Sequence, residues 1–361
     1  RPQSATLTRD DALRLYYLNS FDEASFTRAR AELDAIATWA QAEIFTPPAP
    51  RAADDTPPDA APPAGTPPAT GASGAFGGAA PPPRELTPWV VVALPPRADF
   101  QRWIARTLGP ARTAFFAVGG GYFHDTKTLT AQDLGSTLRH EFLHILHWRD
   151  MSARPVPRAQ PLWLQEGLCS LVEDVRITPG ADDNAPARVI PLPSWRTNTV
   201  KRLASMRRAL TPHQIVALDD DEFRGGRSGR PLAMYAQART LFLFLHERRA
   251  LRDFYHAFAD EWHAPRTSAP NRAADIGARA LERALNADAD TISRDYLAFV
   301  RSLPDVNEQV PTGGASLGVE VDVGEGDGPV ITRVVGSDAR RANLRPGDVI
   351  LFLEGEPVRD T

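Results

Sequence analysis

The sequence predicts an α+β protein in which short strands come early and helices dominate the later part. Residues 89–94 (WVVVAL) form an apolar run of strand length that precedes most of the helical segments. From about residue 131 onward, apolar residues recur at helical spacing. The chain has 361 residues, of which 42% are hydrophobic and 24% charged. This length and composition predict roughly two domains with a sizeable core.

The expected elements follow in order along the chain. Residues 22–45 carry apolar side chains at helical spacing and predict a helix. A buried strand is expected at 89–94, and a short helix at 99–108 that Gly109 and Pro110 end. Further strands are expected at 113–118 and 126–130, on either side of a glycine-rich turn. Later helices are predicted at 132–148, 162–175, 199–209, 231–248, 250–262, 271–286 and 290–302.

Residues 46–85 interrupt this pattern. They hold 12 prolines, 11 alanines and 5 glycines. Such a segment has too few large apolar side chains to offset the entropy lost on ordering. We expect a disordered or polyproline-like insertion within a first domain that spans 1–310. Its alternative role is as a docking segment for a proline-binding module.

Charge and composition exclude several classes of protein. The net charge is −4 and the isoelectric point about 6.1, which argues against a nucleic-acid partner. No apolar run approaches the ~18–20 residues of a spanning helix, so no transmembrane segment is expected. The single cysteine, Cys169, excludes an intrachain disulfide and a thiolate metal cluster. Basic charge is almost entirely arginine, which together with abundant Ala and Pro is typical of a GC-rich bacterial genome.

The most specific motif is HEFLH at residues 140–144. His140 and His144 are four residues apart, so both imidazoles lie on one face of a helix and can bind one metal ion. Glu141 lies about 100° round the helix, where it can reach a water molecule at an open metal position. This combination predicts zinc, with Glu141 as the general base.

The third metal ligand has two candidates. Glu166 lies in the sequence WLQEGL on the next predicted helix, which a short connection brings back beside the first. Asp150 is the alternative, because it occupies the position of the third ligand in the extended metzincin-type pattern. That pattern has a glycine at the position of His147, so the spacing favours Glu166. His147 itself is expected to pack rather than to bind the same ion, since it lies ~10 Å from His140.

HEFLH followed by WLQEGL resembles the gluzincin metallopeptidases of the peptidase MA-like superfamily, over roughly residues 86–260. The resemblance implies a zincin-like fold with zinc bound by His140, His144 and Glu166. It also implies an edge strand beside the active site, which would pair with the backbone of a peptide or protein substrate. The residues implied for this substrate-binding strand are Gly119, Gly120, Gly121 and Tyr122.

Other positions near the motif have less specific roles. Gluzincins often supply a tyrosine or histidine for the oxyanion, and Tyr235 is the candidate here, with a core tyrosine as the alternative. Many gluzincins carry an aspartate four residues after the ligand glutamate, where this chain has Ser170. Cys169 is expected to be buried packing. His213, His256 and His263 are expected at the surface, with His124 a possible substrate contact.

The sequence changes character again near residue 311. Residues 316–361, with SLGV and the run LRPGDVI, resemble the first half of a bacterial-type PDZ domain. The resemblance implies that Leu317, Gly318 and Val319 present backbone N–H groups to the C-terminal carboxylate of a peptide ligand. We therefore expect a truncated PDZ unit over 311–361; the alternative is another small β unit.

These observations predict a zinc metallopeptidase that recruits substrates through its PDZ unit. An extracytoplasmic location, periplasmic or secreted, is expected by analogy with PDZ-linked metallopeptidases. The rival hypotheses are a metzincin-like peptidase with Asp150 as third ligand and a non-catalytic zinc-containing scaffold that acts through the PDZ unit. Glu141 argues against the scaffold, because a structural metal site needs no base.

Overall fold

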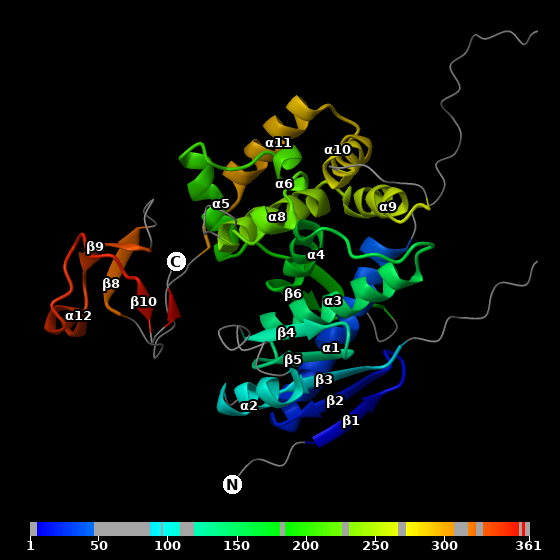
Figure 1. The fold of residues 1–361 in the computed structure, drawn as a ribbon, viewed down its shortest axis with the longest axis horizontal. Helices are drawn as coiled ribbons and strands as arrows, with labels where there is room; N and C mark the ends of the chain where they lie inside the picture. Colours follow the sequence, from blue (N-terminus) through cyan, green and yellow to red (C-terminus); the bar gives the residue numbers. More distant parts are fainter. Residues whose placement is uncertain are drawn as a thin grey trace, which may run out of the picture.

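The computed structural model describes most of the chain, and it is mixed α and β (Figure 1). The predicted insertion at 46–85, the predicted strand at 113–118 and the expected domain boundary near 311 lie almost wholly or wholly outside the described residues. The described ranges are 6–46, 87–94, 97–108, 119–180, 185–225, 231–265, 272–306, 317–322, 328–353 and 356–357.

The N-terminal part is built on a sheet whose strands lie in the order β1-β2-β3-β5-β4. The inner pairs β2–β3 and β3–β5 are parallel, whereas β1 and β4 run antiparallel to their neighbours. The register places Leu15 opposite Trp89, and Val91 opposite Leu129. The first two strands form a hairpin that we did not predict. The strand bounds are β1 Thr6–Asp10, β2 Leu15–Asn19, β3 Trp89–Ala93, β4 Gly120–Phe123 and β5 Thr128–Ala131.

Helices cover both faces of this sheet. One face carries Leu15, Tyr17, Trp89 and Val91 and packs into the main core with α1 (Glu23–Ala40) and α3 (Ser136–Ala153). A π-helical turn, Gln41–Phe45, continues α1. On the other face, α2 (Arg97–Leu108) packs Phe100 and Ile104 against Phe123. The sheet is therefore the middle of three layers, with α3 directly on the side of β4 and β5.

The second half of the chain is mainly helical and packs above α3 in Figure 1. Most predicted helices are present, and local sequence sets several of their starts: Ser194 and Asp288 each accept a hydrogen bond from the first turn that follows. The bounds are α4 Leu162–Cys169, α5 Trp195–Ser205, α6 Pro212–Val216, α7 Asp220–Phe223, α8 Pro231–Glu247, α9 Leu251–Trp262, α10 Arg272–Leu285 and α11 Ala289–Ser302.

The predicted helix at 162–175 was wrong in its second half. The α-helix ends at Cys169, a 3₁₀ turn covers Ser170–Val172, and a small hairpin of β6 (Val175–Thr178) and β7 (Arg188–Pro191) follows. Arg139 from α3 donates hydrogen bonds to the carbonyls of Val172 and Glu173. These bonds turn the chain away from the helix axis, so tertiary contacts override the local apolar pattern.

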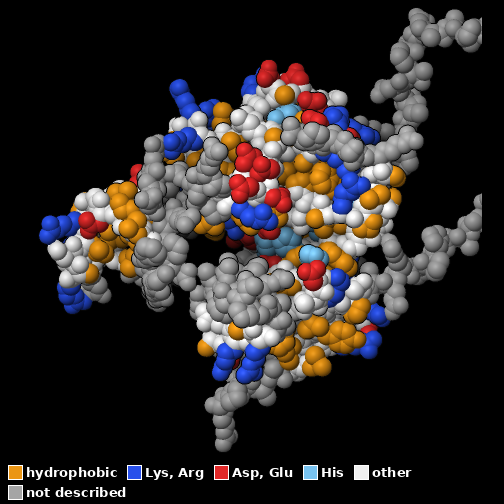
Figure 2. All heavy atoms as spheres, in the orientation of Figure 1, with side chains coloured by type: hydrophobic (Ala, Val, Ile, Leu, Met, Phe, Trp, Pro, Cys, Tyr) orange, Lys and Arg blue, Asp and Glu red, His pale blue; other side chains and the backbone are white. Residues whose placement is uncertain are grey.

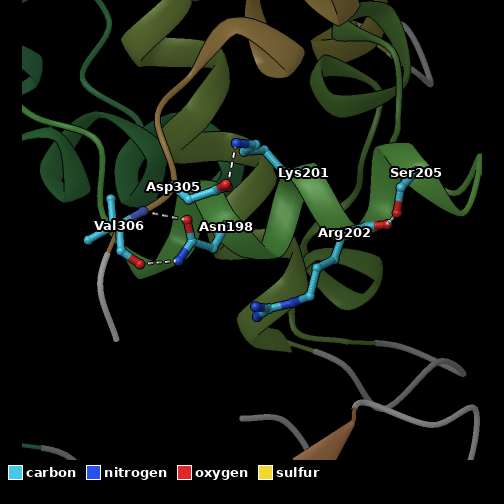
Figure 3. A pocket seen from close by; sticks show the side chains of 6 residues that line it. All are labelled: Asn198, Lys201, Arg202, Ser205, Asp305 and Val306. Atoms are coloured by element: carbon cyan, nitrogen blue, oxygen red, sulfur yellow. Dashed lines mark hydrogen bonds and ion pairs between the residues drawn. The ribbon is translucent and has the colours of Figure 1, made fainter. Parts of the chain in front are cut away.

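Helix α5 also fixes the segment that follows α11 (Figure 3). The Asn198 amide donates to the carbonyl of Val306 at 2.8 Å and accepts its N–H at 3.0 Å. Lys201 donates to the carbonyl of Leu303 and pairs with Asp305. An open hollow on the surface is lined by Asn198, Lys201, Arg202, Ser205, Asp305 and Val306. The last described residues before position 307 are thus tied to helix α5.

The C-terminal residues form a small unit of short strands. β8 (Val319–Asp322) and β9 (Val330–Val334) pair antiparallel, and a bridge joins Val330 to Val349. A short helix, α12 (Ser337–Arg341), follows β9, and β10 (Phe352–Leu353) pairs with β11 (Glu356–Pro357). Gly318 adopts a φ of +68° and lies so close to Gly336 that a side chain at either position would collide.

Across the described residues, none of the helices combines the length and the apolar character that a membrane span requires.

Candidate metal centre

Helix α3 places the two motif histidines side by side. The carboxylate of Asp133 accepts hydrogen bonds from Gly135 and Thr137 and so marks the start of this helix. The next turns bury Leu138, Phe142 and Leu143 in the core. His140 and His144 are buried too, and their Nε2 atoms lie 3.1 Å apart.

Helix α4 brings Glu166 to the same point. Its Oε2 lies 3.2 Å from Nε2 of His140 and 3.5 Å from Nε2 of His144. The next residue, Gly167, lies on the opposite contact of α4, against α8. A Cβ at this position would lie 2.7 Å from the ring of Phe242 in α8. Helix α4 can therefore pack closely on α8 while Glu166 faces α3.

The three ligand atoms fit one tetrahedral ion. Four tetrahedral ligands at the usual zinc distances of about 2.0–2.2 Å lie about 3.3–3.6 Å from one another. The observed separations of 3.1, 3.2 and 3.5 Å are close to these values. The group of His140, His144 and Glu166, which we call the ligand group, could thus hold a metal ion with one position left open.

Electrostatics also favour a cation at the ligand group. Burial by itself would raise the pKa of Glu166, but the two imidazoles outweigh burial and hold that pKa well below its usual value. Burial would lower the pKa of His140, yet its contacts with Glu166 and Glu173 raise it to about 10.

Glu173 completes the surroundings of His140 and was missed in the sequence. Its Oε1 lies 2.9 Å from Nδ1 of His140, the ring nitrogen that faces away from the ligand group. Burial is outweighed by His140 and Arg196, which lower the pKa of Glu173 to about 2. The carboxylate expected four residues after Glu166 is therefore supplied seven residues after it. Helical spacing could not have found it, because α4 ends at Cys169 and the turn that follows brings Glu173 to His140.

Glu141 lies between the ligand group and the edge strand. Burial raises its pKa, with His140 and His144 acting in the opposite direction. A Cβ on Gly120 in β4 would lie 3.4 Å from Cγ of Glu141. The same Cβ would collide with Thr137 at 2.3 Å and with the carbonyl of Thr130 at 2.8 Å. Gly120 is thus required for β4 to pack against α3 within this chain.

Strand β4 has β5 as its neighbour among the described residues. Tyr122 stacks on His144, with ring centroids 5.1 Å apart, and on Trp89 at 5.2 Å. The stack holds the His144 ring against the strand. His124 follows the strand and its side chain is mostly exposed. Its Nε2 lies 2.9 Å from Oδ1 of Asp125. Gly119 and Gly121 flank Gly120 at the same sheet edge.

Tyr235 lies within electrostatic reach of the ligand group. Burial raises its pKa, and the charges of Glu166 and Glu141 raise it further. Its ring packs on Phe223 at 4.8 Å and lies 5.7 Å from the guanidinium of Arg196. The phenol is therefore a protonated hydrogen-bond donor near the two carboxylates.

Cys169 and Ser170 are both fully buried at the end of α4. Burial and the nearby carboxylates Glu166, Glu141 and Glu173 raise the pKa of the Cys169 thiol well above its usual value. The thiol is thus a neutral packing group beside the metal centre. The carbonyl of Ser170 accepts a hydrogen bond from Arg239. Its hydroxyl carries no charge, so Ser170 does not supply the carboxylate that the resemblance implies at this position.

The alternative ligand Asp150 lies six residues beyond His144, more than one turn closer to the C-terminal end of α3. Its Oδ2 accepts a hydrogen bond from Tyr255 at 2.6 Å and pairs with Arg154 at 3.0 Å. The structure groups Glu166, not Asp150, with the two histidines. We predicted His256 and His263 at the surface, and this prediction was wrong. Both side chains are buried, within electrostatic reach of Asp150 and Arg154.

In the C-terminal unit, Gly318 lies between the exposed Leu317 and the first residue of β8, Val319. The carbonyl of Gly318 accepts the N–H groups of Val335 and Gly336. These bonds tie the proposed carboxylate loop to the end of β9.

Figure 2 shows histidine side chains in a hollow at the middle of one face, with acidic side chains on both of its sides.

A scan against protein-family models finds no match for this chain, and a search of curated proteins finds none either.

Proposed function

We propose that this protein is a zinc-dependent peptidase with a gluzincin-type site on a zincin-like fold. The observation that carries the proposal is the convergence of His140, His144 and Glu166 at 3.1–3.5 Å, with the partly buried Glu141 beside them. A bound zinc ion would supply Lewis acidity, which polarises a peptide carbonyl and makes water a nucleophile near neutral pH.

The chain's own residues would supply the remaining chemistry. Glu141 accepts the proton of the attacking water and transfers it to the leaving amine. Its raised pKa suits a base that must later act as an acid. Tyr235 donates a hydrogen bond to the oxygen on which negative charge develops. The substrate backbone pairs with the edge of β4, which lies next to Glu141.

The C-terminal unit would act in recruitment rather than in chemistry. A PDZ-like loop at 317–319 would bind the C-terminus of a substrate or partner protein. By analogy with PDZ-linked metallopeptidases, the combination of a peptidase site and a PDZ-like unit favours a location outside the cytoplasm.

Three variants test the enzyme assignment. Glu141→Gln should retain one zinc per chain and lose about 10²–10⁴-fold in peptide hydrolysis, because the general base is gone. Glu166→Ala should lose zinc, whereas Asp150→Ala should retain it. Zinc content measured by metal analysis and hydrolysis of a peptide library separate the outcomes. Zinc lost in Asp150→Ala but kept in Glu166→Ala would assign the metzincin-like arrangement instead. A zinc-loaded parent that cleaves no peptide would leave the scaffold function.

A further inference from the structure

Arginines from three helices surround the turn that follows α4. Arg139 in α3 donates to the carbonyl of Val172 at 3.0 Å and to that of Glu173 at 2.7 Å. Arg239 in α8 donates to the carbonyl of Ser170 at 2.8 Å. All three hydrogen bonds are to backbone carbonyls, so Arg139 and Arg239 fix where the turn lies without involving the carboxylate of Glu173.

Arg196 in α5 contacts the carboxylate instead. Its Nε and Nη2 lie 2.7 and 3.0 Å from the two oxygens of Glu173. The side chains of Arg196 and Glu173 are only 12% and 10% exposed. A paired, planar contact of this kind fixes the orientation of the carboxylate as well as its charge. The same carboxylate lies 2.9 Å from Nδ1 of His140.

The location of Arg196 is unfavourable for α5 itself. It stands in the first turn of the helix, where its backbone N–H donates a hydrogen bond to the Ser194 hydroxyl. A cation at a helix N-terminus is opposed by the helix dipole. The guanidinium also lies 4.7 Å from the ring of Trp195 and 5.7 Å from that of Tyr235. These contacts, and the pair with Glu173, are what hold a positive charge at this point.

We propose that Arg196 is a positioning residue of the metal centre, acting through Glu173 on His140. It holds the Glu173 carboxylate against Nδ1, so that Nε2 of His140 faces Glu166 and His144. It also offsets one of three negative charges that lie close together, since Glu141, Glu166 and Glu173 together exceed the charge of a divalent ion. This inference rests on the proposed function only in requiring that the ligand group binds zinc.

The test is zinc affinity, measured by competition with a chelator. Arg196→Gln and Glu173→Gln should each weaken zinc binding by about 10–100-fold, as loss of an outer partner of a metal-bound histidine does. The double variant should bind no more weakly than Glu173→Gln alone, because Arg196 acts through Glu173. Arg202→Gln, on the same helix but facing the surface hollow of Figure 3, is the matched control and should bind as the parent does.

A spectroscopic readout separates positioning from general destabilisation. With cobalt(II) in place of zinc, Arg196→Gln should shift the visible absorption bands, Arg196→Lys should shift them less, and Arg202→Gln should leave them unchanged. If Arg196→Gln does not fold, Arg196→Lys and Glu173→Gln carry the test.

Parental zinc affinity and an unchanged cobalt spectrum in Arg196→Gln would overturn the proposal. So would losses that add in the double variant. A parent that binds zinc but hydrolyses no peptide would remove the peptidase function and leave the positioning role intact. A parent that binds no zinc would overturn both.

Discussion

Helix α3 carries two polar clusters that differ in what satisfies their side chains. Near the middle of the helix, Nε2 of His140 and Nε2 of His144 face each other and the carboxylate of Glu166. Farther toward the C-terminal end, Nε2 of His147 lies 2.8 Å from the amide oxygen of Gln160, whose nitrogen lies 3.1 Å from Nε2 of His263. The first cluster brings acceptor atoms together, whereas the second pairs donors with acceptors.

Proton affinity follows the same division. Contacts with two carboxylates raise the pKa of His140 to about 10 in spite of burial. Burial lowers the pKa of His147 to about 4, since a neutral amide offsets little of the desolvation. A buried histidine is therefore a candidate ligand where carboxylates and further acceptors converge on it. It is a packing residue where neutral partners already satisfy it.

The largest expected effect separates the two clusters by metal binding. His140→Ala should lose zinc altogether, by far more than the about 10–100-fold typical of an outer partner. His147→Ala should retain one zinc per chain, although the lost hydrogen bond lowers the free energy of unfolding by about 1–3 kcal/mol. Metal analysis and urea unfolding measure the two quantities. Zinc loss in His147→Ala would mean that the second cluster also takes part in binding.

Two neighbouring glycines, Gly119 and Gly120, test how closely β4 packs on α3 beside Glu141. Gly120→Ala should lower the free energy of unfolding by about 1–3 kcal/mol, because its Cβ would lie 2.3 Å from Thr137 and 2.8 Å from the carbonyl of Thr130. Gly119→Ala is the matched control, since its nearest contact would be a side-chain oxygen of Thr137 at 3.3 Å. Thermal unfolding compares them. Equal stability of the two variants would show that β4 does not pack this closely on α3.

The smallest effect is a pH dependence assigned to His147. Its pKa is about 4 in the fold and near 6.5 in the unfolded chain, so the unfolded state binds more protons between these values. Stability from the neutral imidazole is complete above pH 6.5 and is lost as the pH falls toward 4. The expected loss by pH 5 is about 2 kcal/mol.

His147→Gln removes the titrating group while keeping an amide that can bond to Gln160. Zinc-free parent and variant are to be compared by urea unfolding at pH 7.5 and 5. The parent should lose more stability than the variant. An equal loss in both would assign the acid sensitivity to other groups, such as His256 and His263, whose pKa values burial also lowers.

Local sequence predicted most of the helices and two of the five strands of the main sheet well. HEFLH places His140 and His144 on one face of a helix whatever surrounds it, because four residues make about one turn. The apolar run at 89–94 has few alternatives to a buried strand. In contrast, the N-terminal hairpin has weak patterning of its own and is held by pairing with β3.

The sequence by itself therefore determined that two imidazoles and a neighbouring carboxylate share one helix. Only the tertiary structure decided which further groups meet them, because that depends on how helices pack. The fold turns the chain after Cys169, and the turn directs Glu173 to His140, with Arg196 brought from a helix more than twenty residues later. It also directs Asp150 to Tyr255 and away from the ligand group. Spacing along one helix is a local property, whereas the partners of a buried charge come from whichever elements the core packs around it.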